Sequence, residues 1–143
     1  MELQSYQQGS TGIFPCMIAD CWERVGLEPT CDSRYRDIIS QLDVMIETLR
    51  RHPGRSLLAE LVHLLQVMRH QCGAENTSME LVGYPGAMLH SQRHQSICTF
   101  TAKLCYRFEK SQYLQLSELV DLRFLWLEHI KEHDQAFEAF LIS

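Results

Sequence analysis

Apolar residues recur every three or four positions through most of the chain after residue 30, which is the period of a helix with one buried face. Four such segments predict helices over residues 32–51, 56–79, 87–110 and 117–140. The expected buried positions are Ile38, Ile39, Leu42, Met45, Ile46 and Leu49, then Leu57, Leu61, Leu64, Leu65 and Met68, then Ile97, Phe100, Leu104 and Phe108, and last Leu119, Leu122, Phe124, Leu125, Ile130, Phe137 and Phe140. The alternation typical of strands is missing, so no sheet is expected.

The breaks between these segments are short. His52-Pro53-Gly54 ends the first helix and Gly83-Tyr84-Pro85-Gly86 ends the second, because proline cannot continue a helix and glycine tolerates a tight turn. Ser56 is a suitable N-cap. Gly73 costs the second helix about 1 kcal/mol relative to alanine, yet the helix is expected to continue past it. Four long helices with short links predict an all-α, antiparallel up-and-down four-helix bundle over residues 31–143, preceded by an irregular N-terminal arm over residues 1–30.

Composition narrows the possible environments and partners. The chain has 143 residues, 45% of them hydrophobic, and a formal net charge of -5, which argues against a nucleic-acid partner because phosphate binding requires clustered Lys and Arg. No window approaches the roughly 18 apolar residues that span a bilayer, and we expect no signal peptide because residues 1–12 are polar. The six cysteines form no CxxC pair, so we expect a reducing cytoplasm with the thiols mostly free and buried.

The placement of the histidines carries the chemical information. His90 and His94 are four residues apart, which places both imidazoles on one helix face where they can bind the same ion. His129 and Asp134 are five apart, about 500° of helical rotation, so they are expected to reach a common centre from different angles. A histidine pair with helical spacing is more often solvated surface than a metal site, so spacing alone leaves both interpretations open.

Longer motifs surround these residues. Tyr84-Pro85, followed by His90 and His94 after four and three intervening residues, resembles the YPxxxxHxxxH motif of the hemerythrin and bacteriohemerythrin family. The segment Trp126-Leu127-Glu128-His129-Ile130 with Asp134 looks like that family's WLxxHIxxxD motif, although one residue instead of two separates Leu127 from His129.

A third segment supports the same resemblance. Glu75 and Met79 match the first Glu and the Met of the family's HFxxEExxM segment, and Val25-Gly26 with Asp32 looks like the start of its first helix. The similarity covers roughly residues 25–140.

The resemblance implies a centre of two irons. By position, Glu75 and Asp134 would bridge the irons, and His90, His94 and His129 would complete the first one. In the family, two further histidines complete the second iron, where O2 binds. This chain departs from the pattern at both of those positions, which fall on Tyr35 and Gln71.

These departures leave two outcomes open. In the favoured one, a single metal is held by three histidines and two carboxylates, with room for water or a small diatomic ligand. In the other, a dinuclear centre survives with a Tyr35 phenolate as an unusual ligand. A hydroxyl that hydrogen-bonds Glu75 or a bound water is the simpler role for Tyr35, and Gln71 is expected to fill the space of the imidazole and satisfy a carboxylate.

Other candidate ligands are less favoured. Cys31 and Cys72 each lie one residue out of register with the vacated positions, so a thiolate ligand for zinc stays an alternative. His52, His63, His70 and His133 are expected on the surface, and Trp126 beside the site.

Three functions follow from these expectations. The favoured one is an iron-based sensor or redox protein that responds to O2, NO or peroxide, with a signalling domain as a further partner. The second is a metal-dependent enzyme of the oxidase or peroxidase type, which is weaker because no general base is evident besides Tyr35 and the carboxylates. The third is a structural or signalling domain with an inert or zinc-filled site. Iron is the expected cofactor, with zinc or manganese as alternatives.

Overall fold

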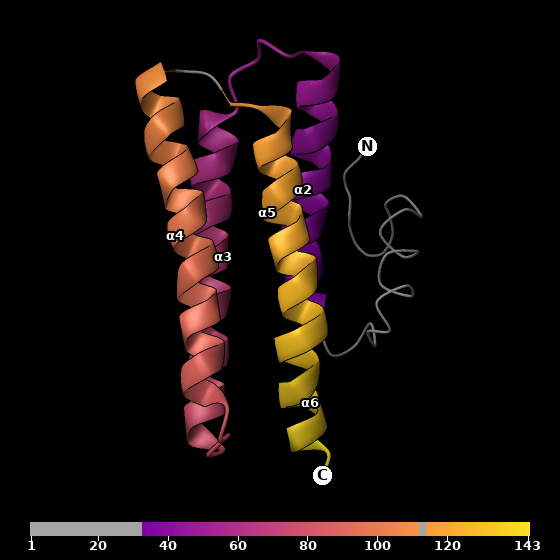
Figure 1. Ribbon diagram of the computed structural model, residues 1–143, viewed down its shortest axis with the longest axis vertical. Coiled ribbons are helices and arrows are strands. Elements are labelled where there is room, and N and C mark those ends of the chain that lie inside the picture. The colour runs from indigo at the N-terminus through magenta and orange to yellow at the C-terminus, as the bar shows by residue number, and fades with distance from the viewer. Residues whose placement is uncertain (1–32, 112–113) are drawn as a thin grey trace.

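The computed structural model describes residues 33–111 and 114–143. These residues form the helices α2 (Ser33–Arg51), α3 (Leu58–Leu81), α4 (Ala87–Ser111), α5 (Leu116–His129) and α6 (Gln135–Leu141), with a π-helical turn, η1 (Ile130–Asp134), between the last two (Figure 1). No strand occurs in the described ranges. The predicted arm over residues 1–30 lies outside them.

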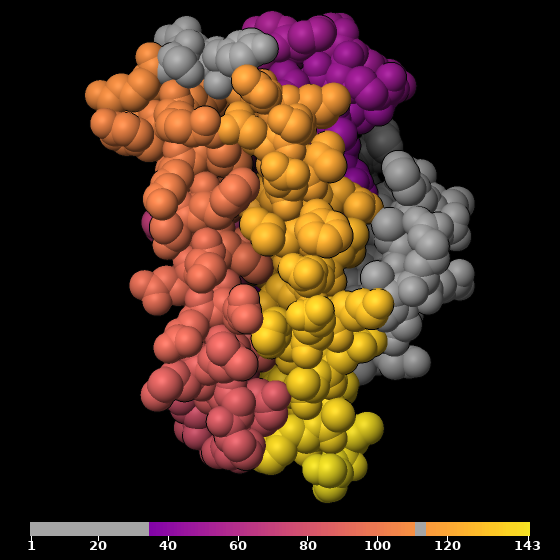
Figure 2. All heavy atoms as spheres, in the orientation of Figure 1, coloured from indigo at the N-terminus to yellow at the C-terminus, as the bar shows by residue number. Residues whose placement is uncertain are grey.

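The helices form the expected antiparallel up-and-down bundle. Figure 1 shows α2 and α4 running in one direction, and α3 and the continuous rod of α5, η1 and α6 running in the other. The helix α3 packs against α2 and α4, and α5 also packs against both of them. Side chains of α4 and α5 meet along the face seen in Figure 2. Among the helices of this bundle as described, none has the length and apolar character needed to cross a bilayer.

The predicted apolar stripes form the core. Most of their members are buried, including Ile38, Leu42, Leu61, Leu64, Leu104, Leu119, Leu122 and Phe137. Phe124 is the wrong prediction, since 62% of its surface is exposed. It lies two residues from both Leu122 and Trp126, which are fully buried, and two residues correspond to about 200° around a helix. Phe124 therefore points to the opposite side of α5.

Local signals set most of the helix ends. Gly83 has a φ of 68°, a conformation that favours glycine. Its amide donates to the carbonyl of Glu80, and the amide of Tyr84 donates to that of Met79. This pair of bonds is a Schellman motif, which ends α3 and starts the turn into α4.

Two predictions about helix ends have different outcomes. The helix α3 continues through Gly73 to Leu81 as expected. Ser56 is not its N-cap, because Leu57 occupies that position without a side-chain cap. The start of α5 lies one residue earlier than expected, at Leu116, where the side chains of Gln115 and Glu118 form a capping box.

Candidate metal centre

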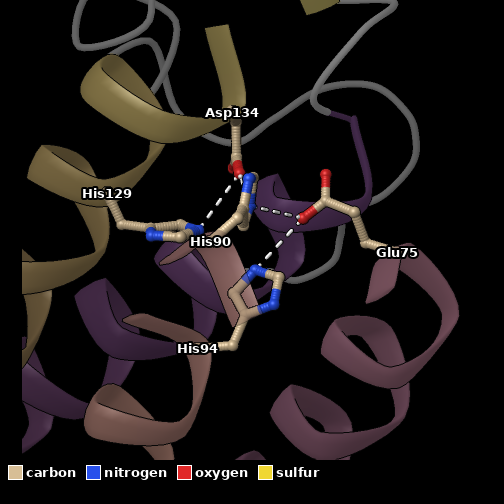
Figure 3. Close-up of side chains that lie close together, drawn as sticks. All are labelled: Glu75, His90, His94, His129 and Asp134. Carbon is tan, nitrogen blue, oxygen red and sulfur yellow. Dashed lines mark ion pairs between the residues drawn. The ribbon is translucent and has the colours of Figure 1, made fainter. Parts of the chain in front are cut away.

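Five ionisable side chains meet inside the bundle, near the end where α3 turns into α4. Glu75 comes from α3, His90 and His94 from α4, His129 from the end of α5, and Asp134 from the end of η1 (Figure 3). Each offers one ligand atom, and these atoms all lie within 4.8 Å of one another. No member is more than 3% exposed. The structure therefore brings together all five residues that the sequence motifs single out, in a buried group that could hold a metal ion.

The π-helical turn explains how His129 and Asp134 reach the same centre. The amide of Gln135 bonds to the carbonyl of Ile130, five residues earlier, so this turn is wider than an α-helical one. Residues five apart then lie close to one face, and His129 Nε2 is 3.1 Å from Asp134 Oδ1. The two residues are better aligned than α-helical geometry predicts. Single π-helical turns are frequent at functional sites.

The contacts inside the cluster lack the geometry of hydrogen bonds. His90 Nε2 lies 2.9 Å from Asp134 Oδ1 and 3.1 Å from Glu75 Oε1, and His94 Nε2 lies 3.1 Å from the same Glu75 oxygen. Within the described part of the chain, Nε2 of His90, His94 and His129 and both oxygens of Asp134 nevertheless have no hydrogen-bond partner. Buried polar atoms are rarely left this way. Atoms that face a common point without bonding one another are arranged as ligands of an ion between them.

The electrostatics of the cluster favour a positive charge at its centre. Burial lowers the pKa of His90, but the carboxylates of Asp134 and Glu75 outweigh burial and raise it to about 9. Burial likewise raises the pKa of Glu75, but the neighbouring imidazoles of His90 and His94 and the hydroxyl of Tyr35 hold it well below its usual range. A metal cation would replace the proton that this arrangement draws to His90.

Asn76 is a functional candidate that the sequence motifs did not identify. Its Oδ1 lies 2.8 Å from Nδ1 of His94. An amide oxygen only accepts, so Nδ1 carries the proton and the lone pair of Nε2 faces the cluster. Partners of this kind orient metal-binding histidines. In the sequence, only its position next to Glu75 indicates that Asn76 could act at this site.

Tyr35 supports the cluster from α2. Its hydroxyl donates a 2.7 Å hydrogen bond to Glu75 Oε1, which is the simpler of the roles expected for it. Burial and the charges of Glu75 and Asp134 raise the pKa of this phenol far above its usual value. Trp126 packs beside the site as expected, with its ring centroid 5.3 Å from that of Tyr35 and 5.8 Å from that of His129.

The structure tests the remaining candidates except Cys31, which lies outside the described residues. No hydrogen bond from the amide of Gln71 to a carboxylate occurs among the described residues, and its buried Oε1 has no partner there either. Cys72 is buried but is not among the converging ligands. His133 is half-buried rather than fully on the surface, with its ring stacked 5.3 Å from that of His129. His52, His63 and His70 are exposed as predicted.

A cavity leads toward the cluster between α4 and α5. It has a volume of about 270 Å³, and its lining includes Arg93, Phe100, Leu125, His129 and His133. The ring of His129 is the point where this cavity meets the candidate ligands.

Comparison of the chain with known protein families, with curated proteins and with solved structures finds no match.

Proposed function

We propose that this protein is a hemerythrin-like non-haem iron protein in which Glu75, His90, His94, His129 and Asp134 hold a single ion. Through that ion it would sense O2, NO or peroxide, or act as a redox protein. The observation that carries the proposal is the convergence of five buried donor groups from three helical segments within 4.8 Å. The short sequence motifs around these residues add the resemblance to hemerythrins.

Charge balance supports a divalent cation. Two carboxylates and three neutral imidazoles carry a formal charge of -2, and burying that charge without a partner costs several kcal/mol. A divalent ion offsets it fully. The pKa of Glu75 is lowered and that of His90 is raised for the same reason. The carboxylates and imidazoles lie side by side, so a positive charge among them is favoured.

The number and kind of the donors favour iron or manganese over zinc. Three imidazoles and two carboxylates offer five ligand atoms, one more than a tetrahedral site takes. Structural zinc sites are almost always tetrahedral, whereas imidazole and carboxylate donors with an open position suit non-haem iron.

One ion is favoured over two because the second site lacks its ligands. Tyr35 directs its hydroxyl at Glu75, and Gln71 offers a neutral amide where the family has an imidazole. Five protein donors leave one position of a six-coordinate ion for water or a small diatomic ligand. The cavity between α4 and α5, which His129 helps to line, is the route that we propose for such a ligand.

Elemental analysis and absorption spectroscopy test this proposal together. Protein purified without oxygen is expected to contain one iron per chain, and its absorption spectrum is expected to change when O2 or NO is added. The substitution His129→Ala should lower the iron content at least tenfold, because it removes one of the five donors, whose Nε2 lies 3.1 Å from Asp134 Oδ1.

His133→Ala is the matched control. His133 lies on the same π-helical turn and stacks on His129, but it is not one of the converging ligands. Equal loss of iron in both variants would contradict the proposed ligand set. One zinc per chain without any spectral response would indicate a structural site instead of a sensor. Two irons per chain would contradict the single-ion centre.

A further inference from the structure

Two cysteines face each other where α3 packs against α4. Thr101 Oγ1 of α4 lies 3.5 Å from Met68 Sδ of α3, and His94 Nε2 lies 3.1 Å from Glu75 Oε1. Because these helices are antiparallel, Cys72 and Cys98 lie opposite each other between the two contacts. The two side chains interact, with Cys72 as hydrogen-bond donor to the Cys98 thiolate, which raises the pKa of Cys72 and lowers that of Cys98.

The two thiols differ in their access to solvent. Cys72 is 4% exposed and belongs to the core. Cys98 is half-buried and opens into a surface groove of about 670 Å³. A partly exposed thiol with a buried thiol behind it is the arrangement in which the first is attacked from solvent and the second resolves the product.

The groove in front of Cys98 is basic. Its lining includes Arg69, Lys103 and Arg107, together with Tyr106, and contains no acidic residue in the described part of the chain. Arg107 also forms an ion pair with Glu118. The hydrogen bond from Cys72 lowers the pKa of Cys98, and the positive charge of Arg69 lowers it further, although burial opposes both. The groove therefore suits a thiolate and a reactant that carries negative charge.

We propose that Cys98 and Cys72 form a redox-active dithiol that reacts with low-molecular-weight disulfides carrying carboxylate groups. The basic groove binds the carboxylates and places the disulfide against Cys98. The product is a Cys72–Cys98 disulfide that links α3 to α4. This proposal does not depend on the metal centre.

The reaction consists of two thiol–disulfide exchanges. The Cys98 thiolate attacks one sulfur of the small disulfide RSSR, which forms a mixed disulfide and releases one RS⁻. Cys72 then loses its proton and attacks the Cys98 sulfur, which releases the second RS⁻. The two protein thiols are oxidised, the small disulfide is reduced to two RSH molecules, and the two protons come from Cys98 and Cys72.

Cys105 provides an internal contrast. It is also half-buried on α4, but it does not line the groove. Burial raises the pKa of Cys105, whereas the pKa of Cys98 is lowered. Cys105 is therefore expected to react slowly with the same disulfide.

Peptide mapping of the full chain after exposure to glutathione disulfide tests the proposal. Trypsin places Cys72, Cys98 and Cys105 on separate peptides, covering residues 70–93, 94–103 and 104–107. The expected main product is a covalent link between the first two peptides. In Cys72→Ser, Cys98 should accumulate as a mixed disulfide with glutathione, and in Cys98→Ser the modification of Cys72 should be at least tenfold slower than that of Cys98.

A further comparison of two disulfides tests the role of the groove. Lys103→Ala should slow the reaction with glutathione disulfide several-fold and leave the reaction with the neutral 2-hydroxyethyl disulfide nearly unchanged, because Lys103 lines the groove but the charge that lowers the pKa of Cys98 is that of Arg69. Absence of the linked peptides, or modification of Cys105 as fast as Cys98, would overturn the dithiol. Equal slowing with both disulfides would overturn the recognition of carboxylates.

Discussion

The two halves of the bundle bury very different side chains. Near the α2–α3 connection the interior is aliphatic and aromatic, with Leu49, Leu57, Leu61 and Phe108 in one continuous cluster. Near the α3–α4 turn the same four-helix packing encloses two carboxylates and three imidazoles. The first half gains stability by burial itself, at about 25 cal/mol per Å² of apolar surface.

The polar half must be stabilised in another way. Several of its buried atoms lack hydrogen-bond partners in the described residues, and each such atom costs about 1–3 kcal/mol. A bound cation would satisfy most of them at once. The comparison therefore predicts that one half of the bundle depends on an ion for its stability and that the other does not.

Removal of the metal should have the largest effect. Metal present at about a thousand times its dissociation constant stabilises a folded protein by about 4 kcal/mol. Dialysis against a strong chelator should therefore lower the free energy of unfolding by at least that amount, as measured by urea denaturation, and restoring iron should recover it. An unchanged midpoint after the metal has been shown to leave would contradict an ion-dependent half.

A substitution in the aliphatic half should behave in the opposite way. Leu61 is fully buried, and Leu61→Ala should cost about 2–5 kcal/mol through lost burial and a cavity. The cost should be the same with and without metal, and the iron content of the folded protein should match that of the unsubstituted chain. If Leu61→Ala removed the iron selectively, the two halves would not be independent.

Asn76 tests the orientation of one ligand. Asn76→Ala removes the acceptor for His94 Nδ1, and loss of such a partner typically lowers metal affinity 10–100-fold. Competition with a chromogenic chelator would measure this change. Asn76→Asp keeps an acceptor oxygen at the same place, so it should retain more of the affinity than the alanine variant. The opposite ranking would show that Asn76 does not act through His94.

Much of the fold follows from the spacing of apolar residues, and the confirmed helices and stripes have that origin. The prediction that Phe124 is buried is wrong because hydrophobicity alone does not say which side of a helix faces the core. The π-helical turn at Ile130–Asp134 could not be predicted from the sequence either, because a period of 3.6 residues assumes an unbroken α-helix. Motifs selected the five converging residues, but they could not give the partner of His94, since a short polar side chain can point in several directions.

The smallest predicted effect concerns Tyr35, which joins α2 to the polar half. Tyr35→Phe removes the 2.7 Å hydrogen bond to Glu75 and keeps the aromatic ring, and a bond to a charged group contributes about 1.5–3 kcal/mol. Part of that free energy is recovered when a cation binds the same carboxylate, so metal should be retained.

The effect of the substitution on the release of metal by acid follows from the pKa of Glu75. The hydroxyl of Tyr35 lowers this pKa, together with the larger influence of His90 and His94. Without it this pKa rises, and protons compete with the metal sooner as the pH falls. The midpoint of iron release in an acid titration should therefore shift to higher pH in the variant, while the visible spectrum keeps its bands. Loss of a visible band would instead identify Tyr35 as a direct phenolate ligand.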